Sequence, residues 1–367
     1  MNITQDSDSE HAPQDNSDTL SDTLIEKFLG VPKPRAAGAN HKSGYVAVVG
    51  QPNVGKSTLV NALLGHKVAI VSPKPQTTRK RILGIHTQAD AQVLFVDTPG
   101  IHQPKSALNK FMMREVEEAL NDCDAILLVV DVSHPLREAD RAIVARIARA
   151  GRPLLLAMNK ADVLDPRDVV AHVEAYTSLI TSNLQAVPGS ANESLTGDGS
   201  PERPTADKKL TVEGLWSNDR AILTSATRGD NLERILPMLF SVLPHGPEYY
   251  PADQVTDQTE RVLAAEYVRE QALRLLDQEV PHAIAVQIDD YIERKNGGAH
   301  IIATIFVERD SQKGILIGQG GRMLKQIGTQ ARKVIEEETG HKVFLELWVK
   351  VRDSWRRDEN AITQLVG

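Results

Sequence analysis

The chain of 367 residues contains only one cysteine, Cys123. A single thiol can neither form an internal disulfide nor build a zinc site on its own, so we interpret Cys123 as a packing residue. Long apolar runs are also missing, and stretches such as Ala125–Val130 are far too short to span a bilayer. No apolar segment follows a basic start, which argues against a secretory signal. We therefore expect a cytoplasmic protein.

Basic residues are absent from the first 26 residues, which carry seven acidic side chains. These seven account for the whole excess of acidic residues (49) over basic residues (42) in the chain. The net charge of −7 therefore does not argue against a body that binds nucleic acid. The segment is rich in polar residues and poor in apolar ones, so we expect disorder up to about Lys42 and treat residues 1–43 as an acidic extension.

Residues 44–245 alternate between short apolar runs and amphipathic, helix-like stretches. The apolar runs are Tyr45–Val49, Gln92–Val96, Ala125–Val130, Leu154–Met158 and Ala221–Leu223. Runs of this length, apolar almost throughout, are typical of a parallel sheet that is covered by helices on both faces. The pattern predicts an α/β domain. Residues 185–220 interrupt it and are dominated by Gly, Pro, Ser and Thr, so we expect a flexible surface insertion there.

A second, smaller domain is expected after a proline-rich linker at residues 246–260. Arg261–Leu276 has the apolar spacing of a helix, and alternating apolar residues at 284–288 and 303–307 indicate two strands. A further helix at Arg322–Thr339 precedes a strand at Val343–Val351. Residues 261–357 therefore predict an α+β unit, and residues 358–367 are left as a C-terminal tail.

A phosphate-binding loop is predicted at Gly50–Ser57, which fits the pattern Gly, four residues, Gly-Lys-Ser. It follows a predicted strand and opens a predicted helix, as the motif requires. Glycines let main-chain N–H groups surround an anion, Lys56 reaches the β- and γ-phosphates, and the Ser57 hydroxyl binds Mg²⁺. The predicted nucleotide contacts are Gly50, Gln51, Pro52, Asn53, Val54, Gly55, Lys56, Ser57 and Thr58.

Two further segments complete the predicted phosphate site. Asp97-Thr98-Pro99-Gly100 ends a strand, so that Asp97 can hold Mg²⁺ through water and the Gly100 N–H can contact a γ-phosphate. Residues 76–80, which we interpret as a first switch segment, offer a threonine to close the Mg²⁺ shell. Thr78 is favoured over Thr77 because the following arginine matches the commoner pattern, but the choice stays open. The switch segment comprises Gln76, Thr77, Thr78, Arg79 and Lys80, and the predicted metal ligands are Ser57, Thr78 and Asp97.

The base is predicted to be guanine. Asn159-Lys160-Ala161-Asp162 ends a strand, and the Asp162 carboxylate can accept hydrogen bonds from guanine N1–H and its exocyclic amine. Adenine lacks this pair of donors and would leave the carboxylate unpaired. Asn159 would bind the base and tie loops together, and the stem of Lys160 would pack on the purine. The pair Ser225-Ala226 would supply a backbone N–H to guanine O6.

These five segments, in this order, resemble the complete signature of a GTPase. Gln51–Ser57, Gln76–Arg79 and Asp97–His102 are similar to the bacterial Era family. Small signalling GTPases place a water-orienting Gln directly after the third motif, where this chain has Ile101. The resemblance implies that K⁺, held by Asn53, assists instead. We thus expect catalysis by Lys56, Thr78 and Asn53, with slow intrinsic turnover on the order of 10⁻⁴ to 10⁻² s⁻¹.

The second domain contains Gly318-Gln319-Gly320-Gly321 between two predicted helices, the device by which KH domains grip a nucleic-acid backbone. Residues 309–357 hold 11 basic and 6 acidic side chains, so positive charge concentrates there. The acidic residues 336–338 would repel RNA and place the binding face at the loop. The segment 341–354, HKVFLELWVKVRDS, resembles the closing strand of the Era family. The predicted RNA contacts are Lys313, Gly318, Gln319, Gly320, Gly321, Arg322 and Lys325, with Trp348 and Trp355 as candidates for base stacking.

The expected fold is therefore an α/β P-loop GTPase domain, its mostly parallel sheet covered on both faces, followed by a smaller α+β type-II KH domain. The Era resemblance implies a monomeric ribosome-assembly factor whose KH domain binds the 3′ end of small-subunit ribosomal RNA under control of GTP. It also implies peripheral association with the inner face of the cell membrane. Two alternatives stay open: a GTPase of tRNA modification, which would need a different second domain, and a nucleotide-binding RNA chaperone with negligible hydrolysis. Intact Lys56, Ser57 and Asp97 argue against the chaperone.

Overall fold

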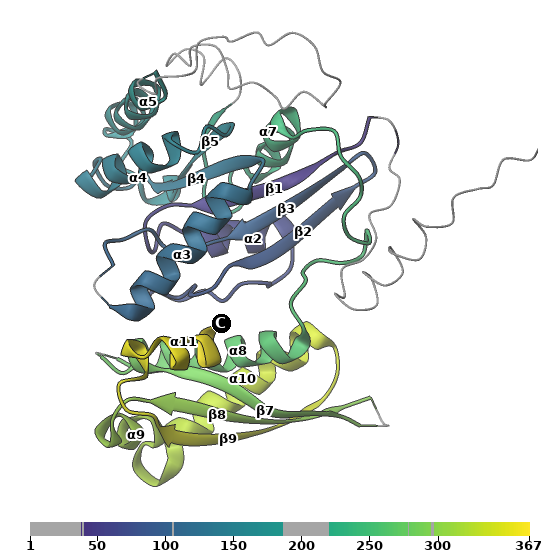
Figure 1. Cartoon of the computed structure of the whole chain (residues 1–367), viewed down its shortest axis with the longest axis vertical. Helices are drawn as coiled ribbons and strands as arrows, with labels where there is room; N and C mark the ends of the chain where they lie inside the picture. Colours follow the sequence, from purple (N-terminus) through teal and green to yellow (C-terminus); the bar gives the residue numbers. More distant parts are fainter. Residues whose placement is uncertain (1–37, 39, 105, 186–219, 278, 295–296) are drawn as a thin grey trace, which may run out of the picture.

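The protein forms two domains stacked one above the other (Figure 1). The structure is a computed structural model that describes residues 38, 40–104, 106–185, 220–277, 279–294 and 297–367. Most of the acidic extension and nearly all of the insertion at 185–220 lie outside these residues, so their predicted disorder and flexibility are not addressed by it.

The first domain is built on a six-stranded sheet in the order β2-β3-β1-β4-β5-β6. Five strands run parallel: β1 (Lys42–Val49), β3 (Ala91–Asp97), β4 (Ala125–Asp131), β5 (Leu154–Asn159) and β6 (Ala221–Leu223). The edge strand β2 (Ile82–Gln88) runs antiparallel to β3. The sequence did not predict β2, and β1 includes Lys42 and Ser43, which had been assigned to the acidic extension.

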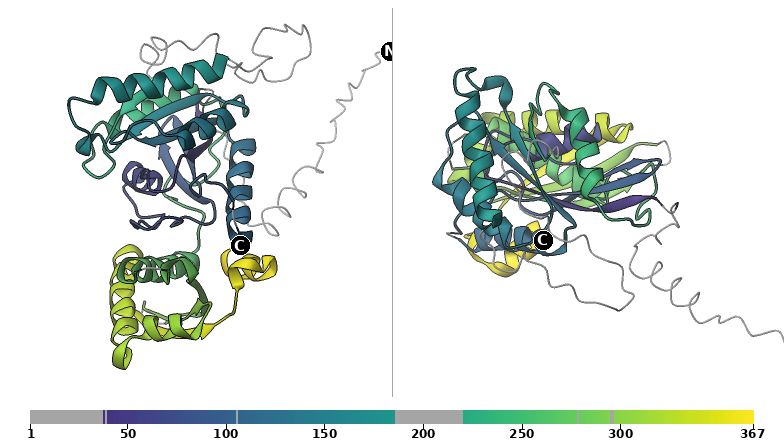
Figure 2. Two further views of the ribbon diagram at one scale, coloured as in Figure 1. Left: turned by 90° about the vertical axis from the view of Figure 1, so that its left-hand side faces the viewer. Right: turned by 90° about the horizontal axis from the view of Figure 1, so that it is seen from above.

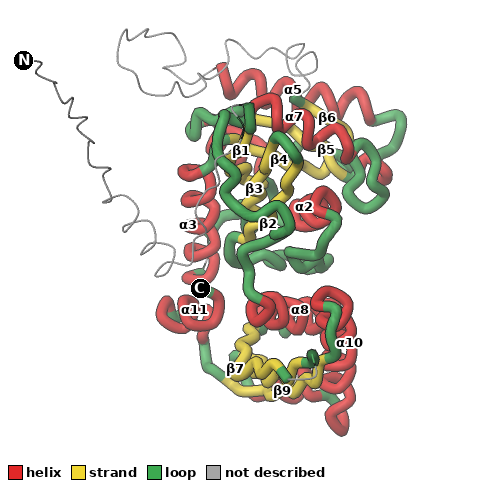
Figure 3. The backbone as a smooth tube through the Cα atoms, turned by 90° about the vertical axis from the view of Figure 1, so that its right-hand side faces the viewer, coloured by secondary structure: helices red, strands yellow, loops and turns green. Residues whose placement is uncertain are grey.

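Helices cover both faces of this sheet, as predicted (Figures 1 and 3). Side chains alternate along the central strands, so that Val46 and Val48 of β1 face one apolar cluster and Ala47 and Val49 face the other. The first cluster includes α2 (Lys56–Leu64) and α7 (Ile235–Val242). The second includes α3 (Ala107–Asp122), α4 (Glu138–Ala148) and α5 (Val169–Gln185). Short 3₁₀ turns η1 (Ala161–Val163) and η2 (Leu232–Arg234) complete the domain.

The connection between the domains follows the edge of the first sheet. The side chain of Gln92 accepts a hydrogen bond from the backbone N–H of Tyr249 and donates one to the Tyr250 carbonyl. The N–H of Ile85 in β2 donates to the Val255 carbonyl at 2.8 Å. These contacts attach the linker to the first domain until the next helix begins at Glu260.

The second domain is a three-stranded sheet with helices on one face. Its elements are α8 (Glu260–Leu275), η3 (Pro281–Ala283), β7 (Ala285–Glu293), β8 (Ala299–Val307), α9 (Asp310–Ile317), η4 (Gln319–Gly321), α10 (Arg322–Thr339) and β9 (Val343–Val351). Strand β8 pairs antiparallel with β7 and parallel with β9. Alternate apolar side chains of β9, from Val343 to Val349, pack against the cluster formed with α8 and α10. The predicted order of helix, two strands, two helices and strand is confirmed.

The C-terminal residues, predicted only as a tail, form the turn η5 (Trp355–Arg357) and the helix α11 (Glu359–Val366). Helix α11 returns to the first domain and lies against α3 (Figure 2). Its side chains Ala361, Ile362 and Leu365 join the apolar cluster of α3. Among the described ranges, no helix has both the length and the apolar composition needed to cross a membrane.

Trp355 is fully buried, and its indole N–H donates to the Ala283 carbonyl at 2.8 Å. Trp355, which the sequence offered only as a candidate for base stacking, cannot stack on RNA bases in this structure because its side chain is part of the core where the two domains meet. Trp348 lies on the open face of the second sheet and is 58% exposed. Base stacking by Trp348 stays a prediction.

Candidate functional site

The phosphate loop joins β1 to α2, and two of its glycines are required by close contacts with neighbouring atoms. Gly50 has φ +154°, and an added Cβ would lie 2.1 Å from the Val129 carbonyl oxygen. Gly55 has φ +97°, and an added Cβ would lie 2.3 Å from Asn159 Nδ2. Any larger residue at either position would displace the loop, so these glycines hold its N–H groups in place at the start of α2.

Lys56 is buried beneath this loop. Its Nζ donates to the backbone carbonyls of Gln51, at 3.0 Å, and Gly50, at 3.3 Å. It forms no ion pair with any acidic residue in the described part of the chain. Burial lowers the pKa of Lys56 to about 8, and the charge of nearby Asp97 acts in the opposite direction. A cation held this way gains most from an anionic ligand, because a bound phosphate supplies the missing counter-charge.

Three side chains whose oxygen atoms can act as metal ligands lie together beside Lys56: Ser57, Thr78 and Asp97. The Ser57 hydroxyl donates to Asp97 Oδ2 at 2.6 Å, and the Thr78 hydroxyl donates to the same oxygen at 3.3 Å. The two hydroxyls are 3.0 Å apart. Asp97 is fully buried, and its Oδ1 has no hydrogen-bond partner. Burial raises the pKa of the Asp97 carboxyl, and Lys56 opposes this shift. An unpartnered carboxylate oxygen beside two hydroxyls suits Mg²⁺, which prefers oxygen ligands.

The same geometry distinguishes the two threonines that the sequence left open. The Thr77 hydroxyl donates to the Lys74 carbonyl at 2.7 Å and is thus engaged within its own segment. The Thr78 hydroxyl lies within the oxygen cluster of Ser57 and Asp97. This arrangement favours Thr78 as the switch threonine.

The segment after β3 crosses closely over the phosphate loop. The N–H of Ile101 donates to the Gly50 carbonyl at 3.0 Å, and an added Cβ on Gly100 would lie 2.6 Å from the backbone nitrogen of Pro52. Thr98 donates its hydroxyl to the Val48 carbonyl. The side chain of Ile101 is buried in the apolar cluster of α3. An aliphatic side chain turned into the core cannot orient a water molecule.

The residues predicted to bind the base lie at the ends of β5 and β6. Asn159 donates to the Val54 carbonyl at 2.8 Å and accepts from the Ala226 N–H at 2.9 Å, so it ties the phosphate loop to the loop after β6, as predicted. Lys160 pairs with Asp131 at 2.7 Å. Asp162 makes no hydrogen bond to another described residue, which leaves its carboxylate available to a ligand.

The backbone amides of the pair Ser225-Ala226 already donate hydrogen bonds within the protein. The Ser225 N–H donates to the Asp230 carbonyl at 3.2 Å, and the Ala226 N–H donates to Asn159. Both amides already have acceptors in this structure, so either would have to share its hydrogen bond in order to contact a base. The pair lies at the expected place, but its contact with guanine O6 stays a prediction.

The predicted switch segment divides between two surroundings. Gln76 donates its side-chain amide to Asn109 at the start of α3, and Thr78 joins the oxygen cluster. Arg79 is buried against the second domain and donates to the carbonyls of His282 and Ile284. The sequence assigned Arg79 to the switch segment, and the structure places its side chain at the domain interface. Its neighbour Lys80 is exposed.

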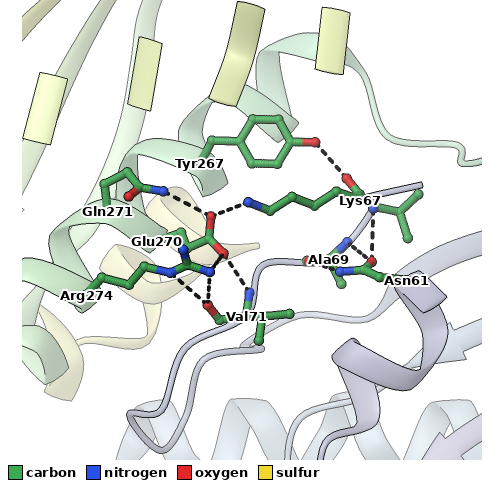
Figure 4. Close-up of polar contacts among 9 residues, drawn as sticks. Asn61, Lys67, Ala69, Val71, Tyr267, Glu270, Gln271 and Arg274 are labelled. Carbon is green, nitrogen blue, oxygen red and sulfur yellow. Dashed lines mark hydrogen bonds and ion pairs between the residues drawn. The ribbon is translucent and has the colours of Figure 1, made fainter. Parts of the chain in front are cut away.

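The interface between the domains is polar around Glu270 of α8 (Figure 4). This carboxylate is fully buried and accepts from Lys67 Nζ at 2.5 Å, from the Val71 N–H at 3.0 Å and from Arg274 at 3.0 Å. Tyr267 donates its hydroxyl to the Lys67 carbonyl. The segment that leads to Thr78 is thus attached to the second domain, a feature that no local sequence motif signals.

The Gly-x-x-Gly loop joins α9 to α10, as predicted. Gly318, Gly320 and Gly321 all have positive φ, at +69°, +59° and +78°. An added Cβ on Gly320 or Gly321 would meet nothing within 4 Å, so the loop is open to a ligand backbone. Arg322 and Lys325 are exposed beside it, and Lys313 is half-buried on α9.

A groove of about 360 Å³ lies beside this loop, between α10 and the edge strand β9. Its lining comprises Gly321, Leu324, Lys325, Gly328, Thr329, Arg332, Phe344, Leu345 and Leu347. Arg332 and Phe344 were not singled out from the sequence. Arg332 lies on α10, about three helical turns after the loop, and Phe344 lies on β9. Both side chains come to line one groove only because α10 packs against β9, which the sequence alone does not show.

Comparisons with known proteins agree with this architecture. Residues 45–160 match the family described as 50S ribosome-binding GTPase, and residues 279–356 match the KH domain family. One similar solved structure is Era in complex with MgGDPNP and nucleotides 1506–1542 of 16S ribosomal RNA, with 36% sequence identity and a TM-score of 0.75. The matched region covers 89% of this chain and 99% of the Era chain. A variant of Aquifex aeolicus Era bound to GDP and AlF₄⁻ is 35% identical, with the same TM-score and the same coverage.

The fold and the site define a P-loop GTPase that carries a C-terminal KH domain. At this identity, over nearly the whole length of its relatives, the chain belongs to the Era family. The family resemblance and the fold predicted from the sequence are thereby confirmed.

Proposed function

We propose that this Era-family GTPase binds the RNA of the small ribosomal subunit through its KH domain and assists maturation of that subunit. The observation that carries the proposal is the presence, in one chain, of a complete GTP site and an open Gly-x-x-Gly groove, in the arrangement of an Era structure that contains 16S ribosomal RNA. The KH domain also argues against the alternative of tRNA modification, which would need a different second domain. A chaperone without hydrolysis is disfavoured because the chain belongs to a GTPase family.

In the GTP site we assign Lys56 to the β- and γ-phosphates and the Gly100 N–H to the γ-phosphate. Ser57, Thr78 and Asp97 would hold Mg²⁺, with Asp97 acting through water. The ion supplies positive charge against the phosphate oxygens when it is bound. Asp162 selects guanine, and Asn159 keeps the base loops attached to the phosphate loop, a role that its hydrogen bonds to Val54 and Ala226 support.

We further propose that K⁺ assists hydrolysis beside Asn53. Asn53 donates its amide N–H to the Pro73 carbonyl at 3.0 Å, which leaves its amide oxygen without a partner among the described residues. The burial of Ile101 supports a charge-based mechanism, since no water-orienting side chain occupies that position. Turnover should be faster in KCl than in NaCl at equal ionic strength, and Asn53→Ala should remove the difference. Equal rates of the unaltered protein in both salts would contradict this assignment.

For RNA, we propose that backbone phosphates approach Gly320 and Gly321, where no side chain intervenes, and that the strand continues along the groove between α10 and β9. Lys325 and Arg332 would pair with phosphates there, and Lys313, Gln319 and Arg322 flank the entrance.

The test uses Gly321→Asp in the full chain, with Gly297→Asp as the matched control. Both glycines have φ +78° and open space around a built Cβ, but Gly297 lies in the turn before β8, far along the chain from the loop. We expect Gly321→Asp to weaken binding of a labelled RNA carrying the 3′ end of 16S ribosomal RNA by about tenfold or more, because it adds a negative charge at the phosphates. Hydrolysis of GTP without RNA should not change. Equal effects of the two variants on RNA binding would refute the assignment of the groove.

The cellular RNA and the location of the protein need separate measurements. Crosslinking and sequencing from cells should recover small-subunit ribosomal RNA, and predominant recovery of tRNA would instead support the alternative. The family resemblance leads us to propose a cytoplasmic monomer with peripheral association at the inner face of the cell membrane. Analytical ultracentrifugation and salt extraction of membrane fractions test these two points.

A further inference from the structure

A cavity of about 240 Å³ lies between the two domains. It is formed by residues 79–82 of the first domain, by α8 and β7 of the second, and by the end of α11. Among the described residues that line it, five side chains are basic and one, that of Glu266, is acidic, and Gly367 adds its terminal carboxylate. The basic residues are Arg79, Lys80, Arg81, Arg261 and Arg269.

Two of these cations contribute less charge to the cavity, because Arg81 forms ion pairs elsewhere and Arg261 is exposed to water. Arg81 pairs with Glu115 and Glu118 on α3. Arg261 donates to the carbonyls of Ile288 and Asp289 at the edge of the second sheet. The charge that matters for a ligand therefore comes from the remaining three.

Arg79 has no carboxylate partner in the described part of the chain, although it is only 4% exposed. Its hydrogen bonds go to two backbone carbonyls, its guanidinium lies 5.6 Å from the centre of the Trp355 ring, and its Nε has no acceptor. Burial, and then repulsion by Arg269, lowers the pKa of Arg79 to about 9, so the charge persists at neutral pH. A buried cation without a counter-ion is costly, and an anion nearby would reduce that cost.

Arg269 adds a second buried charge, with 3% exposure. Its guanidinium contacts Glu266 and donates to the Thr77 carbonyl, while its Nη1 has no acceptor. Glu266 is thus bonded to only one of the two buried guanidinium groups, and the exposed Lys80 adds a further positive charge. Arg79 Nε and Arg269 Nη1 lack hydrogen-bond acceptors, and positive side chains outnumber negative ones in the lining. Both observations favour binding of a negatively charged hydrogen-bond acceptor.

The rest of the lining is mixed: Gln258, Gln287 and Gln364 are polar, and the apolar part includes Val68, Ile82, Ala265, Val286 and Leu365. We propose that this cavity binds a small organic anion, with a phosphate or carboxylate group near Arg79 and Arg269 and an apolar part against these side chains. This site is separate from the GTP site and the RNA groove. Its ligand would contact the switch segment, α8 and α11 at once, and would therefore stabilise the contact between the domains.

The test uses the full chain saturated with GDPNP, a GTP analogue that resists hydrolysis, and Mg²⁺, so that every phosphate position of the phosphate loop is occupied. Phenyl phosphate is titrated by calorimetry, with inorganic phosphate and phenol as separate arms. We expect one saturable site, with phenyl phosphate bound more tightly than inorganic phosphate and phenol bound most weakly. Arg269→Gln should raise the dissociation constant by roughly ten- to hundredfold, the effect of losing one charge-assisted hydrogen bond.

Two further variants make the result specific. Ala265→Leu fills the cavity and keeps every charge, so it should also abolish binding, and it keeps the proposal testable if Arg269→Gln fails to fold. Arg274→Gln is the matched control, since it removes an arginine from the same helix and the same interface but does not line the cavity. GDP affinity should be equal in all variants. Absence of saturable binding, or binding that is unchanged in both Arg269→Gln and Ala265→Leu, would overturn the proposal, and equal affinity for inorganic phosphate would overturn its organic part.

Discussion

Glu270 offers the most direct test of how the two domains are held together. The substitution Glu270→Gln keeps the shape of the side chain but replaces one carboxylate oxygen with an NH₂ group. That group cannot accept the hydrogen bonds that Lys67, Arg274 and the Val71 N–H donate to the carboxylate. At least one of these donors then loses its acceptor in the interface.

The size of the effect follows from the exposure of the partners. Removing one member of a fully buried ion pair costs about 3–5 kcal/mol. Lys67 is 22% exposed and Arg274 is 46% exposed, so water can replace part of what they lose. We therefore expect the contact between the segment 67–71 and α8 to weaken by about 2–3 kcal/mol.

Hydrogen exchange at Val71 reports this loss directly, because its N–H donates to Glu270. In the GDP-bound full chain, a loss of about 2–3 kcal/mol should speed exchange at this amide by about 30- to 150-fold. Asp277→Asn is the control: Asp277 pairs with Lys74 across the same interface but is 85% exposed, so its loss should cost less than about 1 kcal/mol. If the two variants exchange equally fast, the buried carboxylate does not hold the interface and the reasoning fails.

Four further outcomes are expected. Asp162→Asn should lower GTP affinity by roughly a hundredfold or more through the loss of two charge-assisted hydrogen bonds and should favour xanthosine triphosphate in a competition assay; unchanged selectivity would remove Asp162 from the base site. Gly100→Ala should reduce GTP affinity by at least about tenfold, measured with a fluorescent analogue, because its Cβ would lie 2.6 Å from Pro52 N and push on the phosphate loop. Cys123 is buried with its pKa raised to about 11, so iodoacetamide at pH 8 should leave the native thiol unmodified, and alkylation at the rate of the unfolded chain would contradict its burial. Since the unfolded thiol ionises near pH 9 and the folded thiol only near pH 11, Cys123 should reduce stability by up to about 3 kcal/mol as pH rises through this window, a loss that Cys123→Ala should lack in urea titrations.

The parts of the site that could be predicted are those formed by residues that are contiguous in the sequence. The phosphate loop is recognisable because a strand, a glycine-rich turn and a helix follow one another within Tyr45–Leu64, and its chemistry depends on local backbone geometry. The Gly-x-x-Gly loop is predictable for the same reason. The choice of Thr78 over Thr77 could only be suggested, since it depends on where Asp97 lies in space.

The missed features depend on partners far away in the sequence. Strand β2 contains Gly84 and His86, which interrupt its apolar pattern, and it is held by pairing with β3. Arg79 and Glu270 resemble ordinary surface charges in the sequence, because nothing nearby indicates that the other domain buries them. Helix α11 is short and was assigned to a tail, but its apolar side is covered by α3.

The return of α11 to the first domain restricts how the second domain can turn. A domain joined at one point can rotate in every direction, whereas this one touches its neighbour near both the beginning and the end of its own chain, through α8 and α11. Attachment at both ends allows fewer reorientations than attachment at one point would. A rotation that moves α11 away from α3 has to separate Ile362 and Leu365 from that helix and expose their apolar surface to water. Undocking of α11 therefore costs a free energy that can be measured.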